Sequence, residues 1–320
     1  MVDRRAATGR ALTKPREIDG LYGPDSEAWR LNREAMLLLG AGPRALLLQL
    51  AHPLVAAGVD EHSDFRADPW RRLQGTLGSY LTIVYGTATA ARAEIRRLNG
   101  LHRSIAGAGY TARDPDLSLW VHATLVDTTI AAYNAWLEPM PREQRARYYA
   151  ETLPIGRAFG VPADLLPPEF DAFEAYVASM LGPDGPIRVS PVARGLADAV
   201  LHPPLGPVLP ALAVVPARFY AWTLWPSIAL LPASVRADYG FRWGPLERAV
   251  SRWLVAGWRA WRPLLPVSFR QMPQALAADR RLTGDVSARS SEIARRSKSL
   301  PFRRSIRNRT PDSEERAARE

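Results

Sequence analysis

The apolar residues of this chain recur mostly at the 3.6-residue period of an α-helix, with little of the alternation that strands show. Asp-Pro pairs at residues 68–69 and 114–115 each precede an apolar run and are typical helix starts. Thr87 or Thr89 can cap another helix, which Gly107 can end. The patterns predict an all-α fold with one multi-helix domain. We expect three parts: an N-terminal arm over residues 1–30, the helical domain over 31–285 and a flexible basic tail over 286–320.

The composition excludes several classes of protein. At 320 residues and 47% hydrophobic content the chain can bury a sizeable core. It has no cysteine, which excludes disulfides, iron–sulfur clusters, thiolate zinc sites and a cysteine nucleophile. Glycine, proline and arginine interrupt the most apolar regions, so we expect a cytoplasmic protein without an ordinary membrane span. The proline-rich region 207–232 could still rest on a membrane surface.

The net charge of +10 is concentrated in the tail. That segment has little apolar periodicity, which is typical of a flexible chain. Its arginines would attract nucleic acid or anionic lipid without sequence specificity. We therefore expect no specific nucleic-acid partner.

The segment GAGPRA, residues 40–45, satisfies the G-x-G-x-x-A pattern of dinucleotide-binding loops, and Asp60 stands where a ribose-binding acid would. The context differs, because a helix-favouring segment precedes it and no series of β-branched strands follows. We interpret the segment from Gly40 to Pro43 as a break between two helices.

No HExxH, di-iron, GxSxG or P-loop motif is present, so the histidines are the remaining candidates for chemistry. Four of the five fall between residues 51 and 123. His52 and His62 flank a polar loop and could donate to a ligand, although the same residues also form ordinary caps and turns. The five are His52, His62, His102, His122 and His202.

His102 shares a predicted helix face with Ile95, Leu98 and Ile105. An imidazole that points into an apolar wall can serve as the axial ligand of a haem. The alternative is a buried histidine that is hydrogen-bonded to a carbonyl.

His122 lies on a polar stripe with Ser118, Thr129 and Tyr133 in an otherwise apolar helix. Such a stripe can line a pocket. It can equally form an internal hydrogen-bonded network.

Arg72 and Thr76 are four residues apart, so they reach the same side of a helix. Together they could hold propionates or another anion, or polarise bound oxygen. The alternative is that Arg72 pairs with Asp68 or Glu61, while Thr76 bonds its own backbone.

Taken together, the motifs resemble one family. RALLLQLAHPLVAAGVDEHSDFRADPWRRLQGT, LHRSIAG and DPDLSLWVHATLVDTTIAAYN follow in this order, as in the catalytic domain shared by rubber oxygenases (latex-clearing proteins) and the fungal oxygenase of mycophenolic acid synthesis. The resemblance implies a helical fold with a globin-like core. It also implies a b-type haem whose iron is held by one proximal histidine, and cleavage of C=C bonds with dioxygen.

On this resemblance, Arg72 and Thr76 match the distal pair, and His102 matches the proximal iron ligand. His122 matches a further motif and is expected to line the pocket or to serve as the second candidate ligand. His52 and His62 are kept as further cofactor-binding candidates.

The chain departs from the rubber oxygenases at two places. Gly75 stands where they carry a lysine before the threonine. Ala56 and Ala57 occupy the stretch in which their catalytic carboxylate would be expected. Candidate carboxylates nearby are Asp60, Glu61 and Asp64. The resemblance therefore supports a haem pocket better than it supports polyisoprene as the substrate.

Three hypotheses follow. The first is a haem b-dependent oxygenase that uses dioxygen on a hydrophobic small molecule such as an isoprenoid or a lipid. The second is a metal-free helical protein that binds an apolar ligand. The third is a protein that docks on an anionic membrane through its basic tail and the tryptophan-rich region 219–261. A homodimer remains an open alternative.

Overall fold

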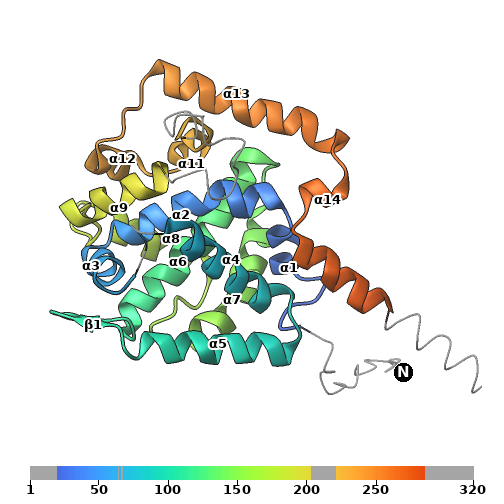
Figure 1. The fold of residues 1–320 in the computed structure, drawn as a ribbon, viewed down its shortest axis with the longest axis horizontal. Coiled ribbons are helices and arrows are strands. Elements are labelled where there is room, and N and C mark those ends of the chain that lie inside the picture. Colours follow the sequence, from blue (N-terminus) through green and yellow to red (C-terminus); the bar gives the residue numbers. More distant parts are fainter. Residues whose placement is uncertain (1–19, 64, 66–67, 203–220, 285–320) are drawn as a thin grey trace, which may run out of the picture. The chain divides into compact units, whose positions relative to one another are not determined.

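The structure is a computed structural model that describes residues 20–63, 65, 68–202 and 221–284. It confirms the predicted all-α fold (Figure 1). The helices are α1 Glu27–Asn32, the π-helix η1 Met36–Gly40, α2 Ala41–Leu50, α3 Pro53–His62, α4 Pro69–Tyr85, α5 Ala88–His102, α6 Pro115–Trp136, α7 Arg142–Ala158, α8 Phe170–Leu181, α9 Pro191–Leu201, α11 Trp225–Ala229, α12 Ala233–Tyr239, α13 Pro245–Trp261, the 3₁₀-helix η3 Arg262–Leu264 and α14 Val267–Arg270. A two-residue hairpin pairs β1 Ala106–Gly107 with β2 Tyr110–Thr111.

The chain divides into a large unit, residues 1–279, and a second unit that begins at Arg280. Of the second unit, residues 280–284 are described, and they are helical. The predicted domain boundaries stay predictions. Ala28 and Trp29 are buried, so residues before position 31 belong to the core. The predicted tail over 286–320 lies outside the described residues.

Helix α6 is the central element of the large unit, and it packs against α2, α7 and α13 (Figure 1). Half of its residues are buried, on every side of the helix. A helix that is covered all round belongs to the interior rather than to the surface. Trp120 near its start joins a cluster formed with α2, α9 and α12, and Trp136 at its end joins a cluster with α1, α7 and α8.

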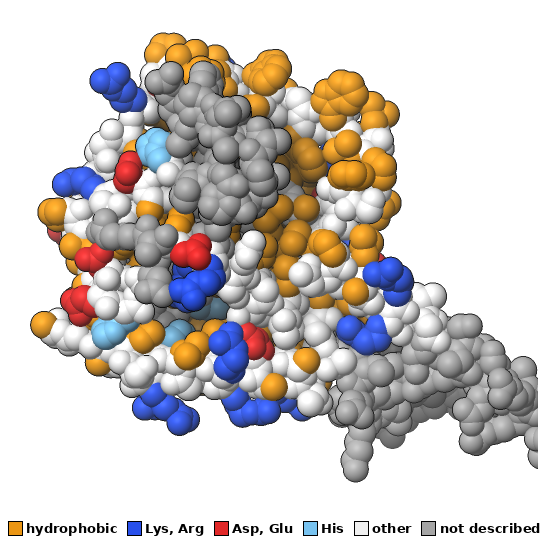
Figure 2. Space-filling model, in the orientation of Figure 1, with side chains coloured by type: hydrophobic (Ala, Val, Ile, Leu, Met, Phe, Trp, Pro, Cys, Tyr) orange, Lys and Arg blue, Asp and Glu red, His pale blue; other side chains and the backbone are white. Residues whose placement is uncertain are grey.

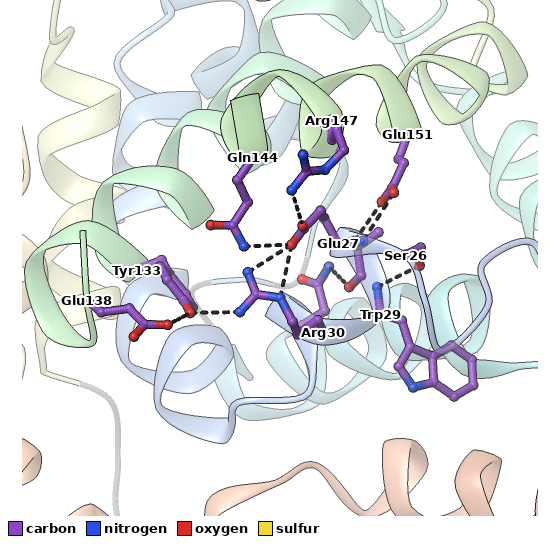
Figure 3. Close-up of polar contacts among 11 residues, drawn as sticks. Ser26, Glu27, Trp29, Arg30, Tyr133, Glu138, Gln144, Arg147 and Glu151 are labelled. Atoms are coloured by element: carbon purple, nitrogen blue, oxygen red, sulfur yellow. Dashed lines mark hydrogen bonds and ion pairs between the residues drawn. The ribbon is translucent and has the colours of Figure 1, made fainter. Parts of the chain in front are cut away.

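Helix α1 is fixed to α6 and α7 by polar contacts (Figure 3). The carboxylate of Glu151 accepts hydrogen bonds from the backbone N–H groups of Glu27, at 3.1 Å, and Ala28, at 2.8 Å. These bonds satisfy N–H groups of the first turn that have no partner within the helix. Arg30 in turn donates to the Tyr133 hydroxyl of α6 at 2.8 Å. The short helix α1 is therefore held by its neighbours rather than by its own length.

The predicted break from Gly40 to Pro43 is wrong. The chain winds as a π-helix up to Gly40 and continues directly into α2. Pro43 is tolerated because it lies in the first turn of α2. Gly40 packs closely on α6, since a Cβ at this position would stand 3.1 Å from the ring of Trp136. Arg44 is buried, and its guanidinium donates to Asp127 and Thr128 of α6, both at 2.6 Å. This glycine-rich segment therefore packs α2 against α6.

The start of α5 is confirmed, since the side chain of Thr87 accepts from the N–H of Ala90. Its predicted end at Gly107 is wrong, because α5 ends at His102 and Gly107 belongs to β1. Gly109 adopts a φ of 80° in the hairpin turn, a conformation that favours glycine. Ile105 consequently lies beyond the helix and does not extend the face that carries His102.

The starts of α4 and α6 follow the Asp-Pro pairs as predicted. Asp68 and Asp114 each accept a hydrogen bond from an N–H of the first helical turn. Among the described helices, none is long and apolar enough to cross a membrane.

Candidate functional site

A tight turn brings Arg72 and His102 to the same level of the molecule. Helices α4 and α5 pack together and are joined through Gly86 and Thr87 (Figure 1). Arg72 lies 14 residues before Gly86, and His102 lies 16 residues after it. The start of α4 therefore lies near the end of α5, and the positive charge of Arg72 contributes to lowering the pKa of His102.

His102 is the last residue of α5 and is half-buried. Its ring centroid lies 6.4 Å from that of Phe159, which follows α7. Burial is the main cause that lowers the pKa of His102, and the charge of Arg72 is the second. Both effects disfavour the imidazolium, so the ring is neutral at neutral pH and has a free lone pair.

His122 lies in the middle of α6 beside the last turn of α7. Its Nε2 atom is buried and has no hydrogen-bond partner within the described part of the chain. Burial lowers the pKa of His122 to about 4. A Cβ at Gly156 of α7 would lie 3.5 Å from His122 Cδ2, so the imidazole lies close to the α7 backbone. A buried polar atom without a partner is costly and is often found at sites of function.

His102 and His122 each lie beside a residue at the end of α7. His122 lies beside Gly156, and His102 lies beside Phe159, three residues further along. Asn99 of α5 donates to the carbonyl of Ala158 at 2.8 Å, which fixes the end of α5 to the end of α7. Three helices thus bring two neutral imidazoles to one corner of the protein. We call His102, His122, Arg72 and Thr76 the histidine site.

Arg72 and Thr76 lie on the open part of α4. Every residue from Arg71 to Thr76 is exposed, and six successive helical positions cover the whole circumference. A Cβ at Gly75 or Gly78 would meet no atom within 4 Å. Residues 71–76 of α4 are therefore open to solvent.

The structure supports the purely structural alternative for Thr76 but not the one for Arg72. Thr76 donates from Oγ1 to the carbonyl of Arg72 at 2.9 Å, so its hydroxyl does bond its own helix. At the helix start it is Arg71 that pairs with Asp68, at 3.6 Å. Among the described residues, no ion pair joins Arg72 to Asp68 or Glu61; Glu61 accepts from Tyr110 at 2.7 Å.

His52 and His62 lie at the two ends of α3, and each has a structural contact. His52 Nδ1 accepts from the N–H of Leu54 at 3.3 Å and so caps α3. Burial lowers the pKa of His52. His62 Nε2 lies 3.0 Å from the carbonyl of Ala106 in the hairpin. Both residues stay predictions as cofactor contacts.

Sequence reasoning missed a buried polar cluster next to the histidine site. Tyr80 of α4 donates to Asn32 of α1 at 2.7 Å. Burial raises the pKa of Tyr148 of α7, and hydrogen bonds with Thr129, Tyr80 and Asn32 oppose that effect. Thr129 lies two turns after His122 on α6, so the cluster continues the predicted polar stripe. The polar stripe indicated that α6 contributes to such a cluster, but the other members lie on α1, α4 and α7, which the sequence pattern did not identify.

An apolar groove lies at the far end of α6. It has a volume of about 680 Å³ and is formed by α6, α11 and α13. Trp136, on its wall, is 14 residues from His122, or about 20 Å along the helix axis. The groove is therefore separate from the histidine site. Its lining comprises Ala135, Trp136, Pro226, Ala229, Leu230, Ser251, Arg252, Val255, Ala256, Arg259 and Ala260.

The described residues contain no group of three or more histidine, aspartate or glutamate side chains placed to hold a metal ion. A haem iron differs from such a site, because the porphyrin supplies four ligands and the protein supplies one or two. Of the candidate carboxylates, Glu61 is engaged with Tyr110, and Asp64 lies outside the described residues.

Comparison with known protein families places the chain in an oxygenase-type family. Residues 29–265 match the family described as "ER-bound oxygenase mpaB/B'/Rubber oxygenase, catalytic domain". The chain belongs to this family, as its motifs predicted.

Two curated relatives are similar to the chain over 235 residues at 27% identity, which covers 69% of this chain and 87% of each relative. They are the uncharacterized proteins Mb2261 of Mycobacterium bovis and Rv2237 of Mycobacterium tuberculosis. No solved structure matches the chain.

Proposed function

We propose that the protein is a haem b-dependent oxygenase that acts on a hydrophobic small molecule, such as an isoprenoid or a lipid, with His102 as the axial ligand of the iron. The proposal is supported by membership of an oxygenase family. The single observation that carries it is the position of the half-buried His102 at the end of α5, which packs against α4, the helix that carries Arg72 near its start. Those two residues come from different helices and match the family's distal and proximal motifs.

The residues present fit a haem. Iron binds the neutral form of histidine, and burial together with Arg72 lowers the pKa of His102. Open space beside Gly75 and Gly78 gives α4 a side that a flat macrocycle could approach. The orphaned Nε2 of His122 supplies a second buried nitrogen in the same corner. When bound, the haem would supply the redox chemistry that activates dioxygen.

The chain itself would supply binding and electrostatics. Neutral His102 offers a lone pair without first losing a proton. The guanidinium of Arg72 is a fixed positive charge that can hold a propionate or stabilise a developing negative charge on oxygen. The hydroxyl of Thr76 donates to Arg72 O, and it must rotate away from that carbonyl before it can donate to a ligand.

The test is an ultraviolet–visible spectrum of the protein purified after expression with haem supply. We expect a strong Soret band in the wild type, its loss in His102→Ala, and its retention in His202→Ala, an exposed histidine at the end of α9. Loss in His122→Ala with retention in His102→Ala would move the axial role to His122. No band in any variant despite adequate haem would overturn the haem proposal.

A metal-free protein that binds an apolar ligand is the second candidate, and the groove at the end of α6 favours it. Its volume of about 680 Å³ lies in the range of ordinary ligand sites, and most of its lining is apolar. Titration with a fluorescent fatty acid would test it, with Ala256→Trp as the variant that fills the groove. Saturable binding that this variant abolishes, in a protein without a Soret band, would favour this function over the oxygenase.

A further inference from the structure

The outer face of α13 is apolar although it faces solvent. Positions 246, 249, 253, 256 and 260 alternate three- and four-residue steps, which places them on one side of a helix. All five are exposed and apolar, and Trp253 is exposed to 73%. The opposite side of α13 faces the body, where Ser251 is buried. The helix therefore has one side that packs on the protein and a second apolar side without a partner in the described chain.

The exposed apolar surface continues past the end of α13. Trp261 is 65% exposed, and it is followed by three more exposed apolar side chains, one in η3 and two in α14. Figure 2 shows hydrophobic side chains gathered over the region that α13 and α14 occupy in Figure 1. Scattered exposed apolar residues are ordinary, but a contiguous group indicates a binding surface. We call this group the α13 edge: Leu246, Ala249, Trp253, Ala256, Ala260, Trp261, Leu264, Val267 and Phe269.

A row of arginines runs beside the apolar stripe. Arg248, Arg252 and Arg259 are four and seven residues apart, so they share one flank of α13. All three are exposed, and no ion pair within the described part of the chain involves them. Arg259 donates to the carbonyls of Ala135 and Trp136, at the end of α6, which leaves its positive charge uncompensated.

The segment around α13 carries a net positive charge. Residues 241–271 contain six arginines and one acid, Glu247, which accepts from the N–H of Gly244 at 2.8 Å. Tryptophan and phenylalanine beside arginines are the residues that insert at a lipid–water interface while cations contact anionic headgroups. A second copy of α13 would bring the same arginine rows together, which like charges oppose.

We propose that the α13 edge docks on the surface of an anionic lipid bilayer, with α13 lying in the plane of the membrane. The stripe and Phe269 enter the interface, and the arginine row binds lipid phosphates. The groove that α13 forms with α6 and α11 has Arg252, Ala256 and Ala260 in its lining, so it opens beside this docking surface. The inference is independent of whether a haem is bound.

The test is co-sedimentation of the full-length protein with vesicles of phosphatidylcholine, with and without phosphatidylglycerol. We expect binding to the anionic vesicles to exceed binding to the neutral ones and to weaken as salt is raised. Arg248→Gln/Arg252→Gln should weaken it about 30-fold, from the contribution of each arginine near a charged surface. Trp253→Ser should weaken it about tenfold, and Trp253→Phe should largely retain it.

The matched control is Arg92→Gln/Arg96→Gln. These two exposed arginines stand four residues apart on α5, as Arg248 and Arg252 do on α13. The control should bind as the wild type, and circular dichroism should show that all variants fold. Unchanged binding of the α13 variants would assign lipid binding to another basic part of the chain and overturn the proposal. A dimer in sedimentation velocity that Trp253→Ser dissociates, without vesicle binding, would identify a second copy as the occupant.

Discussion

The middle and the C-terminal end of α6 lie beside opposite departures from ordinary protein interiors and surfaces. Near its middle, His122 keeps a polar Nε2 atom buried without a partner. At its other end, α13 covers the helix and keeps large apolar side chains in solvent. A buried polar atom and an exposed apolar group both cost free energy unless a partner compensates them. The comparison teaches that the buried site and the exposed surface that we propose bind other molecules lie along one central helix.

The two regions also differ in the contacts that hold them to the rest of the protein. The histidine site lies among helices that pack through buried side chains. Helix α13 and the segment after it depend more on polar contacts: Arg262 donates to Glu34 of the α1–η1 connection at 2.6 Å, and Met272 N donates to Arg33 O at 2.9 Å. We therefore expect substitutions at the core end to affect stability, and substitutions on the α13 edge to affect binding.

The largest expected effect is a contrast between two tryptophans. Trp136→Ala removes a side chain that is 1% exposed and packs against Gly40, and should lower the free energy of unfolding by about 3–5 kcal/mol. Trp253→Ala removes one that is 73% exposed and should change it by no more than about 0.5 kcal/mol. Urea unfolding of both variants would measure the difference. Equal losses would show that α13 contributes to the core as strongly as α6 does.

The next effect concerns the pH dependence of stability. Burial lowers the pKa of His122 to about 4 from 6.5. Between these values the unfolded chain binds a proton that the folded chain does not, so stability falls as pH is lowered through this window. The shift corresponds to about 3 kcal/mol. Above pH 6.5 His122 is neutral in both the folded and the unfolded chain, so this loss of stability is absent.

His122→Leu should remove this acid-dependent loss of stability. Leucine fills the space beside Gly156 that the imidazole occupies and leaves no polar atom buried without a partner. The stability of the variant at pH 7.5 should therefore lie within about 1 kcal/mol of the wild type. Its loss of stability between pH 6.5 and 4 should be smaller by about 2–3 kcal/mol. His202→Leu, at an exposed position, is the control for removal of a histidine. An unchanged pH profile in His122→Leu would mean that His122 titrates normally in the folded protein.

The smallest effect tests the approach of Arg72 to His102. Arg72→Leu should raise the pKa of His102 because it removes a nearby positive charge. Since Arg72 is exposed, the difference should be modest and should shrink as salt is added. Proton NMR of the ring resonances in protein produced without haem would measure it. A pKa that stays the same in the variant at low salt would show that the two side chains do not share a site.

Much of the fold could be predicted from particular residues. Asp68, Thr87 and Asp114 each accept hydrogen bonds at the start of a predicted helix. These are local interactions, so the sequence around them is sufficient. The failures at Gly40–Pro43 and at the end of α5 have a different cause. There the chain conformation depends on packing with Trp136 and on pairing within the hairpin, which no local pattern encodes.

The sequence by itself determined the helical class, the family and the identity of the candidate side chains, because period, caps and motif order are properties of neighbouring residues. Only the tertiary structure decided that His102 and His122 each lie beside a residue at the end of α7, while His52 caps α3 and His62 contacts the hairpin. It also decided that the stripe on α13 faces solvent. The periodicity of a helix states that one side is apolar, but which side is covered depends on helices distant in sequence.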